Sequence, residues 1–243
     1  MKKILVLGAG AMGSAFTVPC VDNNNDVVLV GTHLEDEAIE NIKKKENFHK
    51  VLNCKLPKNL RVEKFENFQD EIKKTPDLIV IGVNSKGIEW AGKEISKNFN
   101  SSPSILLLTK GLTIINEKFE TLVEKFKFIL KNNAINDANV SAVGGPCLAS
   151  GLANRIKSSV VLANEKTEII KSIGDMISTN YYNVEYSNDL IGVEICAAIK
   201  NIYSMIIGAS EGLSSSNVEK EIKSKYFLNT AASLMYRAIS EMS

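Results

Sequence analysis

Short apolar runs alternate with amphipathic stretches along the first three quarters of the chain. Six runs rich in β-branched residues or leucine predict strands over Lys3–Leu7, Val27–Val30, Asp77–Val83, Ser104–Thr109, Asn139–Val143 and Ser158–Ala163. Between them, apolar residues at helical spacing predict helices over Met12–Asn24, Glu35–Lys45, Gly87–Asn98 and Lys118–Lys131. Strands that are apolar almost throughout are typical of a parallel sheet covered by helices on both faces. We therefore predict a doubly wound α/β domain whose ligand site lies at the carboxyl ends of the strands.

The pattern changes in the last quarter of the chain, where no strand is predicted. A long apolar helix is expected over Ile191–Ala209 and a second helical stretch over Val218–Met242. The run Ser214-Ser215-Ser216-Asn217 between them predicts a turn with a helix N-cap. We therefore predict an α/β domain over residues 1–187 and the start of an all-α domain over residues 188–243.

Composition and charge narrow the classes of protein to which this chain can belong. Hydrophobic residues make up 44% of it and charged residues 23%, as in an ordinary soluble globular protein. Lys and Arg number 29 against 28 Asp and Glu, so the chain lacks the basic excess of a general nucleic-acid or membrane-surface binder. The apolar run Ile4–Leu7 is too short for a signal peptide, and no run of about 18 apolar residues is found. We expect a cytoplasmic protein with no membrane span and no nucleic-acid partner.

The cysteines and histidines do not form the sequence patterns that are typical of metal sites or disulfide frameworks. The four cysteines lie far apart without a C-x-x-C pair, and the chain has two histidines. Scattered ligands of this kind do not predict a zinc site. We expect reduced thiols and no metal ion; the residues concerned are Cys20, Cys54, Cys147, Cys196, His33 and His49.

A glycine-rich turn stands directly after the first predicted strand. The run Gly8-Ala9-Gly10-Ala11-Met12-Gly13 has the form G-x-G-x-x-G and opens a predicted helix, which is the context that a dinucleotide-binding fingerprint requires. Gly8 permits the tight turn, Gly10 lets the backbone approach a pyrophosphate, and Gly13 lets the helix pack close to the sheet. The motif predicts that residues 1–187 form a Rossmann-type dinucleotide-binding domain.

The end of the second predicted strand bears on the choice between NAD and NADP. NAD sites usually carry an acidic residue there, whereas NADP sites carry a basic or small polar one. The strand ends in Leu29-Val30-Gly31-Thr32-His33, with Glu35 and Asp36 beyond, so no acid is expected at its tip. Thr32 and His33 could both hydrogen-bond a 2′-phosphate, although His33 could equally begin a loop. The pattern favours NADP over NAD.

Two further turns are candidates for the ligand site. Lys110 follows a central strand and precedes Gly111, which can take an unusual backbone angle, so we expect Lys110 at the carboxyl edge of the sheet. A surface lysine is the alternative interpretation. The run Gly144-Gly145-Pro146-Cys147-Leu148-Ala149 gives a tight turn at the same edge, or merely a loop between strands.

The apolar helix in the last quarter contains polar residues. The stretch Ile191–Ile202 is apolar almost all round, which predicts a buried helix. Its polar residues include Glu194 and Asn201, which share one helix face, and Lys200, one step round from Asn201. Burying an ammonium group is costly unless it is paired or neutralised. Lys200 is therefore either an ion-pair partner or a catalytic acid.

These segments, in this order, resemble the NAD(P)-dependent glycerol-3-phosphate dehydrogenase family over essentially the whole chain. The matching motifs are GAGAMG at Gly8–Gly13, TKG at Thr109–Gly111, GPCLA at Gly145–Ala149, NDLIGVEICAAIKNI at Asn188–Ile202, GASEGL at Gly208–Leu213 and AISEM at Ala238–Met242. The resemblance implies reduction of dihydroxyacetone phosphate to sn-glycerol 3-phosphate, the backbone precursor of phospholipids, with NAD or NADP as cofactor.

The resemblance also implies roles for individual residues. Lys200 would be the catalytic proton donor or acceptor, with Asn201 beside it, and Lys110 would contact both substrate and cofactor. For the remaining positions it implies that Gly145 and Cys147 line the glycerol-phosphate site and that Ala11, Met12 and Ala149 touch the nicotinamide cofactor, with Cys147 in place of the family's usual serine.

The chain departs from the family pattern at three points. The family usually has an aromatic residue where Met12 stands, and its bacterial members usually have W-x-R where Val30 and Thr32 stand. The family also continues beyond the position of Ser243, so the helical domain is expected to be incomplete. The chain is then a truncated form, a protein whose missing part is supplied elsewhere, or a catalytically impaired one.

Three functions are compatible with the sequence. The first is NAD(P)-dependent reduction of a phosphorylated three-carbon substrate. The second is another lysine-dependent reduction, of the ketopantoate or β-hydroxyacid type, and the third is dinucleotide binding without turnover. The oligomeric state stays open, with a homodimer as one option.

Overall fold

The structure is a computed structural model that describes residues 1–98, 104–115, 117–215 and 220–242. It divides into two compact units, Met1–Glu194 and Ile195–Ser243. The division falls inside one long helix. The domain boundary expected between residues 187 and 188 stays a prediction, since compactness alone locates the division a few residues later.

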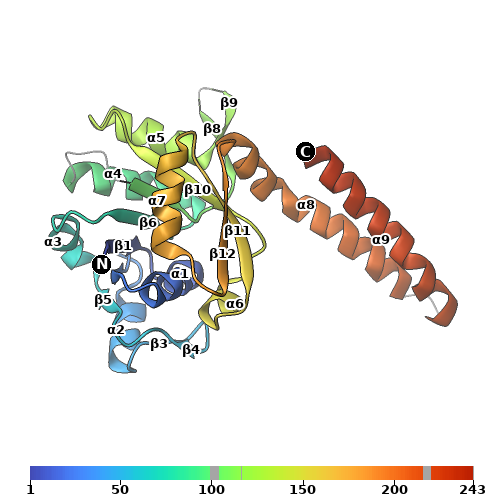
Figure 1. The fold of residues 1–243 in the computed structure, drawn as a ribbon, viewed down its shortest axis with the longest axis horizontal. Coiled ribbons are helices and arrows are strands. Elements are labelled where there is room, and N and C mark those ends of the chain that lie inside the picture. Colours follow the sequence, from blue (N-terminus) through green and yellow to red (C-terminus); the bar gives the residue numbers. More distant parts are fainter. Residues whose placement is uncertain (99–103, 116, 216–219, 243) are drawn as a thin grey trace. The chain divides into compact units, whose positions relative to one another are not determined.

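An eight-stranded sheet forms the centre of the first unit (Figure 1). Its strands are Lys3–Leu7 (β1), Asp26–Val30 (β2), Arg61–Glu63 (β5), Leu78–Ile81 (β6), Ser104–Leu107 (β7), Asn139–Gly144 (β10), Ser158–Ala163 (β11) and Tyr182–Ser187 (β12). They lie in the order β12-β11-β10-β7-β6-β1-β2-β5, and neighbours are parallel except for β10 and β11, which are antiparallel. The predicted fold class, a doubly wound Rossmann-type sheet followed by helices, is confirmed, and the sheet is mixed rather than wholly parallel.

Helices cover both faces of the sheet because successive side chains of a strand point to opposite sides. In β1, Ile4 and Val6 join one hydrophobic cluster, while Leu5 and Leu7 join the other. The helices that add residues to the first cluster are Ala11–Asp22 (α1), Asp36–Lys44 (α2), Ala149–Ala153 (α6) and Thr167–Ile177 (α7). Those that add residues to the second are Phe68–Ile72 (α3), Ile88–Asn98 (α4), Leu122–Asn132 (α5) and, through Leu190 alone, Leu190–Ser215 (α8).

All six predicted strands are present, but one predicted helix begins late. The stretch expected to be helical from Lys118 is a strand, Lys118–Thr121 (β9), which pairs antiparallel with Leu112–Ile115 (β8). The helix α5 starts only after Thr121, whose hydroxyl accepts a hydrogen bond from the Glu124 N–H at 3.3 Å. This N-cap satisfies a donor at the helix start and fixes the boundary there.

Several elements of the first unit have no counterpart in the sequence prediction. The edge strand β12 was missed because its buried side chains, Tyr182 and Val184, alternate with exposed ones over only six residues. The short strands Phe48–His49 (β3) and Cys54–Lys55 (β4) form a separate hairpin. Edge and hairpin strands bury little apolar surface, so the apolar pattern that reveals central strands is weak in them.

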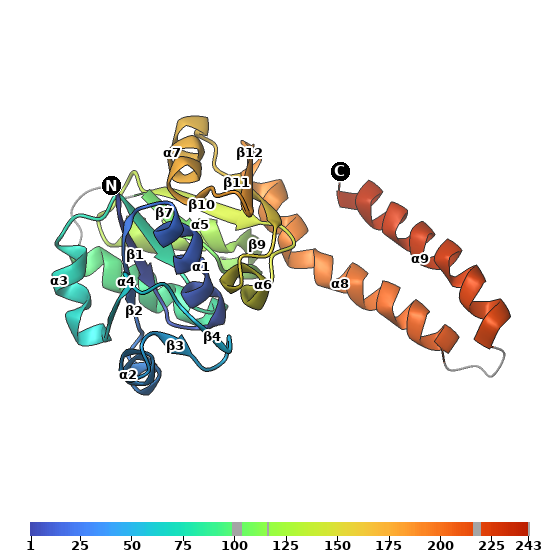
Figure 2. The same cartoon turned by 60° about the horizontal axis from the view of Figure 1, so that its bottom comes forward.

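The second unit contains most of α8, Leu190–Ser215, and α9, Lys220–Met242, which run side by side in Figures 1 and 2. The Tyr203 hydroxyl donates to the Glu241 carboxylate at 2.8 Å. The sequence predicts that α8 is buried, and in the described chain this is wrong, since Ile202 is 54% exposed. Two paired helices bury only the faces that they turn to each other.

The helix α8 is more apolar than its sequence suggests, since no uninterrupted apolar run of about 18 residues occurs in it. Its segment Leu190–Gly212 has a mean hydropathy of 1.6, long and apolar enough to cross a membrane by length and composition alone. Core helices of soluble proteins pass the same test, so the finding is weak support for a membrane span. The turn predicted at Ser214–Asn217 lies partly outside the described residues.

The packing of α1 on the sheet leads to a prediction about Gly13. A Cβ atom on Gly13 would lie 2.1 Å from the carbonyl oxygen of Gly8, a backbone atom that cannot move alone. We expect Gly13→Ala to lower the free energy of unfolding by about 2–3 kcal/mol. Urea denaturation measures this, with Gly10→Ala as the matched control because its Cβ would meet only Glu35 Oε1, at 3.9 Å. Equal stability of the two variants would contradict the close packing.

Candidate dinucleotide and substrate site

The glycine turn places the start of α1 at the carboxyl end of β1. Gly8 has φ +110°, and its N–H donates to the Val30 carbonyl at 2.8 Å, which ties the turn to β2. A Cβ on Gly8 would stand 2.9 Å from the backbone of Gly82, just after β6. The turn is therefore packed tightly on its inner side. Gly10, the N-cap of α1, is not crowded by backbone, and a Cβ there would meet only Glu35 Oε1, at 3.9 Å.

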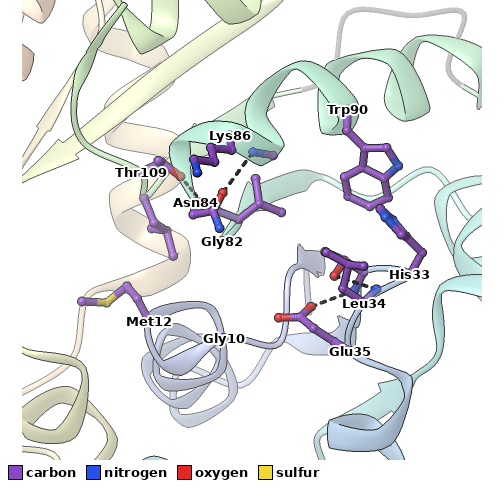
Figure 3. A pocket seen from close by; sticks show the side chains of 14 residues that line it. Gly10, Met12, His33, Leu34, Glu35, Gly82, Asn84, Lys86, Trp90 and Thr109 are labelled. Atoms are coloured by element: carbon purple, nitrogen blue, oxygen red, sulfur yellow. Dashed lines mark hydrogen bonds between the residues drawn. The ribbon is translucent and has the colours of Figure 1, made fainter.

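A cavity of about 690 Å³ opens beside this turn (Figure 3). Its walls come from the segments that follow β1, β2, β6 and β7, and the lining residues are Gly10, Met12, Thr32, His33, Leu34, Glu35, Gly82, Val83, Asn84, Lys86, Gly87, Trp90, Leu108 and Thr109. Parallel strands end at the same edge of a sheet, so their loops converge there. The Thr109 hydroxyl donates to the Val83 carbonyl and holds two of these segments together. The volume is in the range of sites for small molecules and cofactors.

Two of the lining residues, His33 and Trp90, belong to a cluster of aromatic rings. The His33 ring lies 5.0 Å from the Trp90 ring, which lies 5.0 Å from Phe65, and Phe65 stacks on Phe68 at 5.4 Å. His33 and Trp90 face each other in Figure 3 from two different segments. Both residues predicted to discriminate the cofactor, Thr32 and His33, therefore line the cavity.

Glu35 is a site residue that the sequence analysis missed. Its Oε2 atom accepts hydrogen bonds from the Ala9 N–H at 2.9 Å and from the Thr32 N–H at 2.8 Å. The expectation that no acid stands at the tip of the second strand is therefore wrong, because the Glu35 side chain folds back to that tip. The signal was present in the sequence, since an acid about 20 residues after the glycine motif is part of the fingerprint.

A second, much smaller cavity brings together four of the predicted residues. Met12, Lys110, Gly145 and Cys147 line a space of about 20 Å³, with Tyr182 among the other lining residues. Met12 and Leu108 also line the large cavity, so the two spaces adjoin. The turns predicted around them have the expected backbone, with φ +148° at Gly111 and +128° at Gly145.

The thiol of Cys147 is electrically neutral at ordinary pH. Its burial raises its pKa, and the nearby Ser158 hydroxyl and the positive charge of Lys110 oppose that effect without reversing it. A neutral thiol can accept and donate weak hydrogen bonds, as the serine usual in the family does more strongly. All four cysteines of the sequence are free thiols.

The other predicted residues lie outside both cavities. Ala11 and Ala149 pack against the first hydrophobic cluster, and they are not among the described residues that line either space. Lys200 and Asn201 are exposed residues of α8 in the second unit. Their roles stay predictions, as do those of the cavity residues.

Glu194, on the same helix but within the first unit, is buried with 6% exposure. Its Oε1 accepts from the Val123 N–H at 3.1 Å in the first turn of α5, while its Oε2 is buried without a hydrogen-bond partner. Burial raises the pKa of this carboxyl, against the lowering effect of hydrogen bonds from Thr121 and Val123. Folding therefore stabilises the protonated form of the Glu194 carboxyl relative to its ionised form.

The N-terminal and C-terminal parts of the chain both match models of one protein family. A family model described as the N-terminus of NAD-dependent glycerol-3-phosphate dehydrogenase matches residues 3–170, and the corresponding C-terminal model matches residues 189–243. The chain belongs to the NAD-dependent glycerol-3-phosphate dehydrogenase family. The resemblance inferred from the sequence motifs is confirmed.

Individual relatives agree with this assignment. The NADP(+)-dependent glycerol-3-phosphate dehydrogenase of Archaeoglobus fulgidus is 31% identical over 98% of this chain and 68% of its own length. The glycerol-3-phosphate dehydrogenase [NAD(P)+] of Oceanobacillus iheyensis is 28% identical over 88% of this chain and 59% of its own length. The chain thus spans about 60–70% of the length of these two relatives.

Solved structures share the fold. The glycerol-3-phosphate dehydrogenase of Coxiella burnetii superposes with a TM-score of 0.77 at 21% identity, covering 99% of this chain and 67% of that one. The enzyme of Plasmodium falciparum gives a TM-score of 0.76 at 22% identity, covering 99% and 64%. At these identities the likeness concerns the fold alone.

The absence, in the described chain, of backbone atoms within 4 Å of the Gly10 Cβ position leads to a prediction about ligand binding. We expect Gly10→Val to abolish NADH and NADPH binding, because its side chain would occupy the approach to the start of α1. The free energy of unfolding should change by less than about 1 kcal/mol, since the substitution meets no backbone atom. Titration calorimetry and urea denaturation measure the two quantities. Unchanged NADPH affinity would show that the turn does not bind a dinucleotide.

The buried carboxyl of Glu194 leads to a prediction about pH. Because its pKa is raised above the ordinary value of 4.5, its protonated form contributes stability that is present below pH 4.5 and lost as the pH rises through the folded-state pKa. Glu194→Gln does not lose stability in this way, because an amide does not ionise between pH 4 and pH 8. We expect the variant to gain stability relative to the parent as the pH rises from 4 to 8. Urea denaturation across this range checks the slope; a constant difference would contradict the burial effect.

Proposed function

We propose that this chain reduces dihydroxyacetone phosphate to sn-glycerol 3-phosphate with a nicotinamide dinucleotide. The observation that supports this most strongly is the convergence of the glycine turn, Lys110 and Cys147 on two adjoining cavities at the carboxyl edge of one sheet. The relatives named above carry this activity in their names.

The residues around the large cavity fit the proposed cofactor. The open backbone at Gly10 and the start of α1 offer N–H groups to a pyrophosphate. The segment from Thr32 to Glu35, with Trp90 opposite, receives the adenosine half. Met12 and Leu108, at the junction with the small cavity, lie toward the reacting half. The bound cofactor supplies the hydride that reduces the carbonyl carbon.

The residues around the small cavity form one corner of the substrate site. A space of about 20 Å³ admits a group the size of a water molecule, which is less than a three-carbon phosphate. Lys110 brings a positive charge to this corner, and Gly145 leaves room for close approach of the ligand to the backbone. Cys147 offers a neutral, weakly hydrogen-bonding thiol. The corner therefore suits an oxygen-rich, negatively charged substrate.

Proton transfer is assigned to Lys200 on the strength of the family motif. Reduction of a ketone leaves negative charge on oxygen, and an ammonium group supplies the proton that this alkoxide requires. Asn201, beside Lys200, offers an amide that can orient the substrate oxygen. Lys200 is exposed, so the burial from which the sequence analysis argued is absent, and the catalytic interpretation rests on the family motif.

A second candidate function is dinucleotide binding without turnover. It is favoured by the exposed apolar side chains of α8 and α9, such as Ile206 and Ile239, which leave the second unit with little buried core among the described residues. Family membership gives no such support to a ketopantoate-type reductase. A spectrophotometric assay with NADH and NADPH, each with dihydroxyacetone phosphate or ketopantoate, separates the three functions.

We place the protein in the cytoplasm, with a small phosphorylated ligand and no nucleic-acid partner. The near balance of 29 basic and 28 acidic residues supports the absence of a nucleic-acid partner. We also propose that α8 does not span a membrane. It carries Glu194 and Lys200, which are costly in a bilayer, and the family's C-terminal model covers it. A homodimer stays a prediction.

The role of Lys200 can be tested by substitution. We expect Lys200→Ala to lower turnover by about 10²–10⁴-fold, the usual scale for general acid–base catalysis, with NADPH affinity unchanged. Stability should also be unchanged, because Lys200 is exposed. The matched control is Lys171→Ala, another exposed lysine, on α7. Parent-like turnover, or a variant that melts early, would count against Lys200 as the acid.

A further inference from the structure

Glu35 offers a carboxylate to the large cavity in a defined orientation. The two backbone hydrogen bonds described above, from Ala9 and Thr32, both end on Oε2. They fix the side chain between the glycine turn and the end of β2. The other oxygen, Oε1, lies 3.9 Å from the position that a Cβ would take on Gly10. Figure 3 shows this carboxylate directed toward Gly10 along the cavity wall.

The two residues that favoured NADP are engaged in other contacts. The Thr32 hydroxyl accepts from the Leu34 N–H at 3.4 Å, and its backbone N–H is held by Glu35. The His33 ring packs 5.0 Å from Trp90 and 6.4 Å from Phe65. These contacts hold both side chains in the cavity wall without adding a positive charge that is fixed at every pH.

The charges around the cavity also bear on its ligand. Among the described residues that line it, Glu35 is the one carboxylate, Lys86 the one lysine, and there is no arginine. Lys86 belongs to the segment between β6 and α4, whereas Glu35 follows β2 (Figure 3). An arginine near the end of the second strand is the usual partner of a 2′-phosphate, and a carboxylate there is the usual partner of a ribose hydroxyl.

We propose that Glu35 makes this site selective for NAD over NADP. Its Oε1 accepts hydrogen bonds from the hydroxyls of the adenosine ribose, and its negative charge repels a 2′-phosphate at the same position. The inference rests on the proposed dinucleotide function and reverses the preference drawn from the sequence. It also separates this chain from the relative that is named NADP(+)-dependent.

The test compares NADH and NADPH binding in three proteins. Trp90, the single tryptophan of the chain, lines the cavity, so its fluorescence reports binding of either ligand without turnover. Glu35→Gln is the informative variant. Its amide oxygen can keep both backbone bonds in place of Oε2, while an uncharged NH₂ replaces Oε1. Asp36→Asn removes the same charge from the next residue, which is exposed and outside the cavity lining, and serves as the control.

We expect the parent to bind NADH at least tenfold more tightly than NADPH. Glu35→Gln should weaken NADH binding by roughly tenfold, the scale of one charge-assisted hydrogen bond, and should strengthen NADPH binding. Asp36→Asn should leave the ratio of the two affinities unchanged. A parent that binds NADPH equally or more tightly overturns the inference, as does an unchanged ratio in Glu35→Gln or an equal shift in Asp36→Asn.

Two further outcomes of the binding experiment have to be interpreted: a variant that does not fold, and a parent that binds neither cofactor. If Glu35→Gln fails to fold, competition on the parent replaces it: adenosine should displace NADH more effectively than adenosine 2′-phosphate, and the reverse order overturns the inference. If the parent binds neither NADH nor NADPH, the proposed function fails and the inference with it. Tight NADPH binding with weak NADH binding, by contrast, overturns the selectivity alone.

Discussion

The close approach of three glycines, Gly8, Gly13 and Gly82, is the constraint on which the rest of the site depends. A Cβ on Gly13 would lie 2.1 Å from the Gly8 carbonyl oxygen, and one on Gly82 would lie 2.8 Å from the Gly13 Cα. The start of α1 is thereby pressed against the ends of β1 and β6. Only this packing brings the N–H groups of the helix start to the sheet edge, where the loops after β2, β6 and β7 form a cavity.

The same edge explains why residues far apart in sequence meet. Lys110 follows β7 and Cys147 follows β10, and these two strands are neighbours in the sheet. Met12, at the start of α1, borders both cavities. The position of each candidate residue is thus set by the strand that precedes it and by the strand order. A change in the packing of α1 would shift the shared wall of both cavities.

The sequence predicts the centre of the fold well and its periphery poorly. Central strands such as β1 and β6 are buried on both faces, so their residues are apolar in continuous runs that are easily recognised. The hairpin β8–β9 and the edge strand β12 are partly exposed and lack this pattern. The burial predicted for α8 was wrong for a different reason. An apolar composition shows that a helix can be buried, but in the described chain much of the apolar surface of α8 is exposed.

Glu35 and Glu194 show why the chemistry of a site is harder to predict than its location. Both are acidic residues whose carboxylates accept a backbone N–H from a segment far away in the sequence. The fingerprint spacing could have indicated Glu35, whereas no such pattern indicates Glu194. Their second oxygens differ. That of Glu194 is buried without a partner, so its burial raises the pKa and makes stability depend on pH. Glu35 is only partly buried and lines a cavity, so its second oxygen can meet a ligand. Whether such a carboxylate affects stability or ligand choice depends on its exposure, which only the folded chain determines.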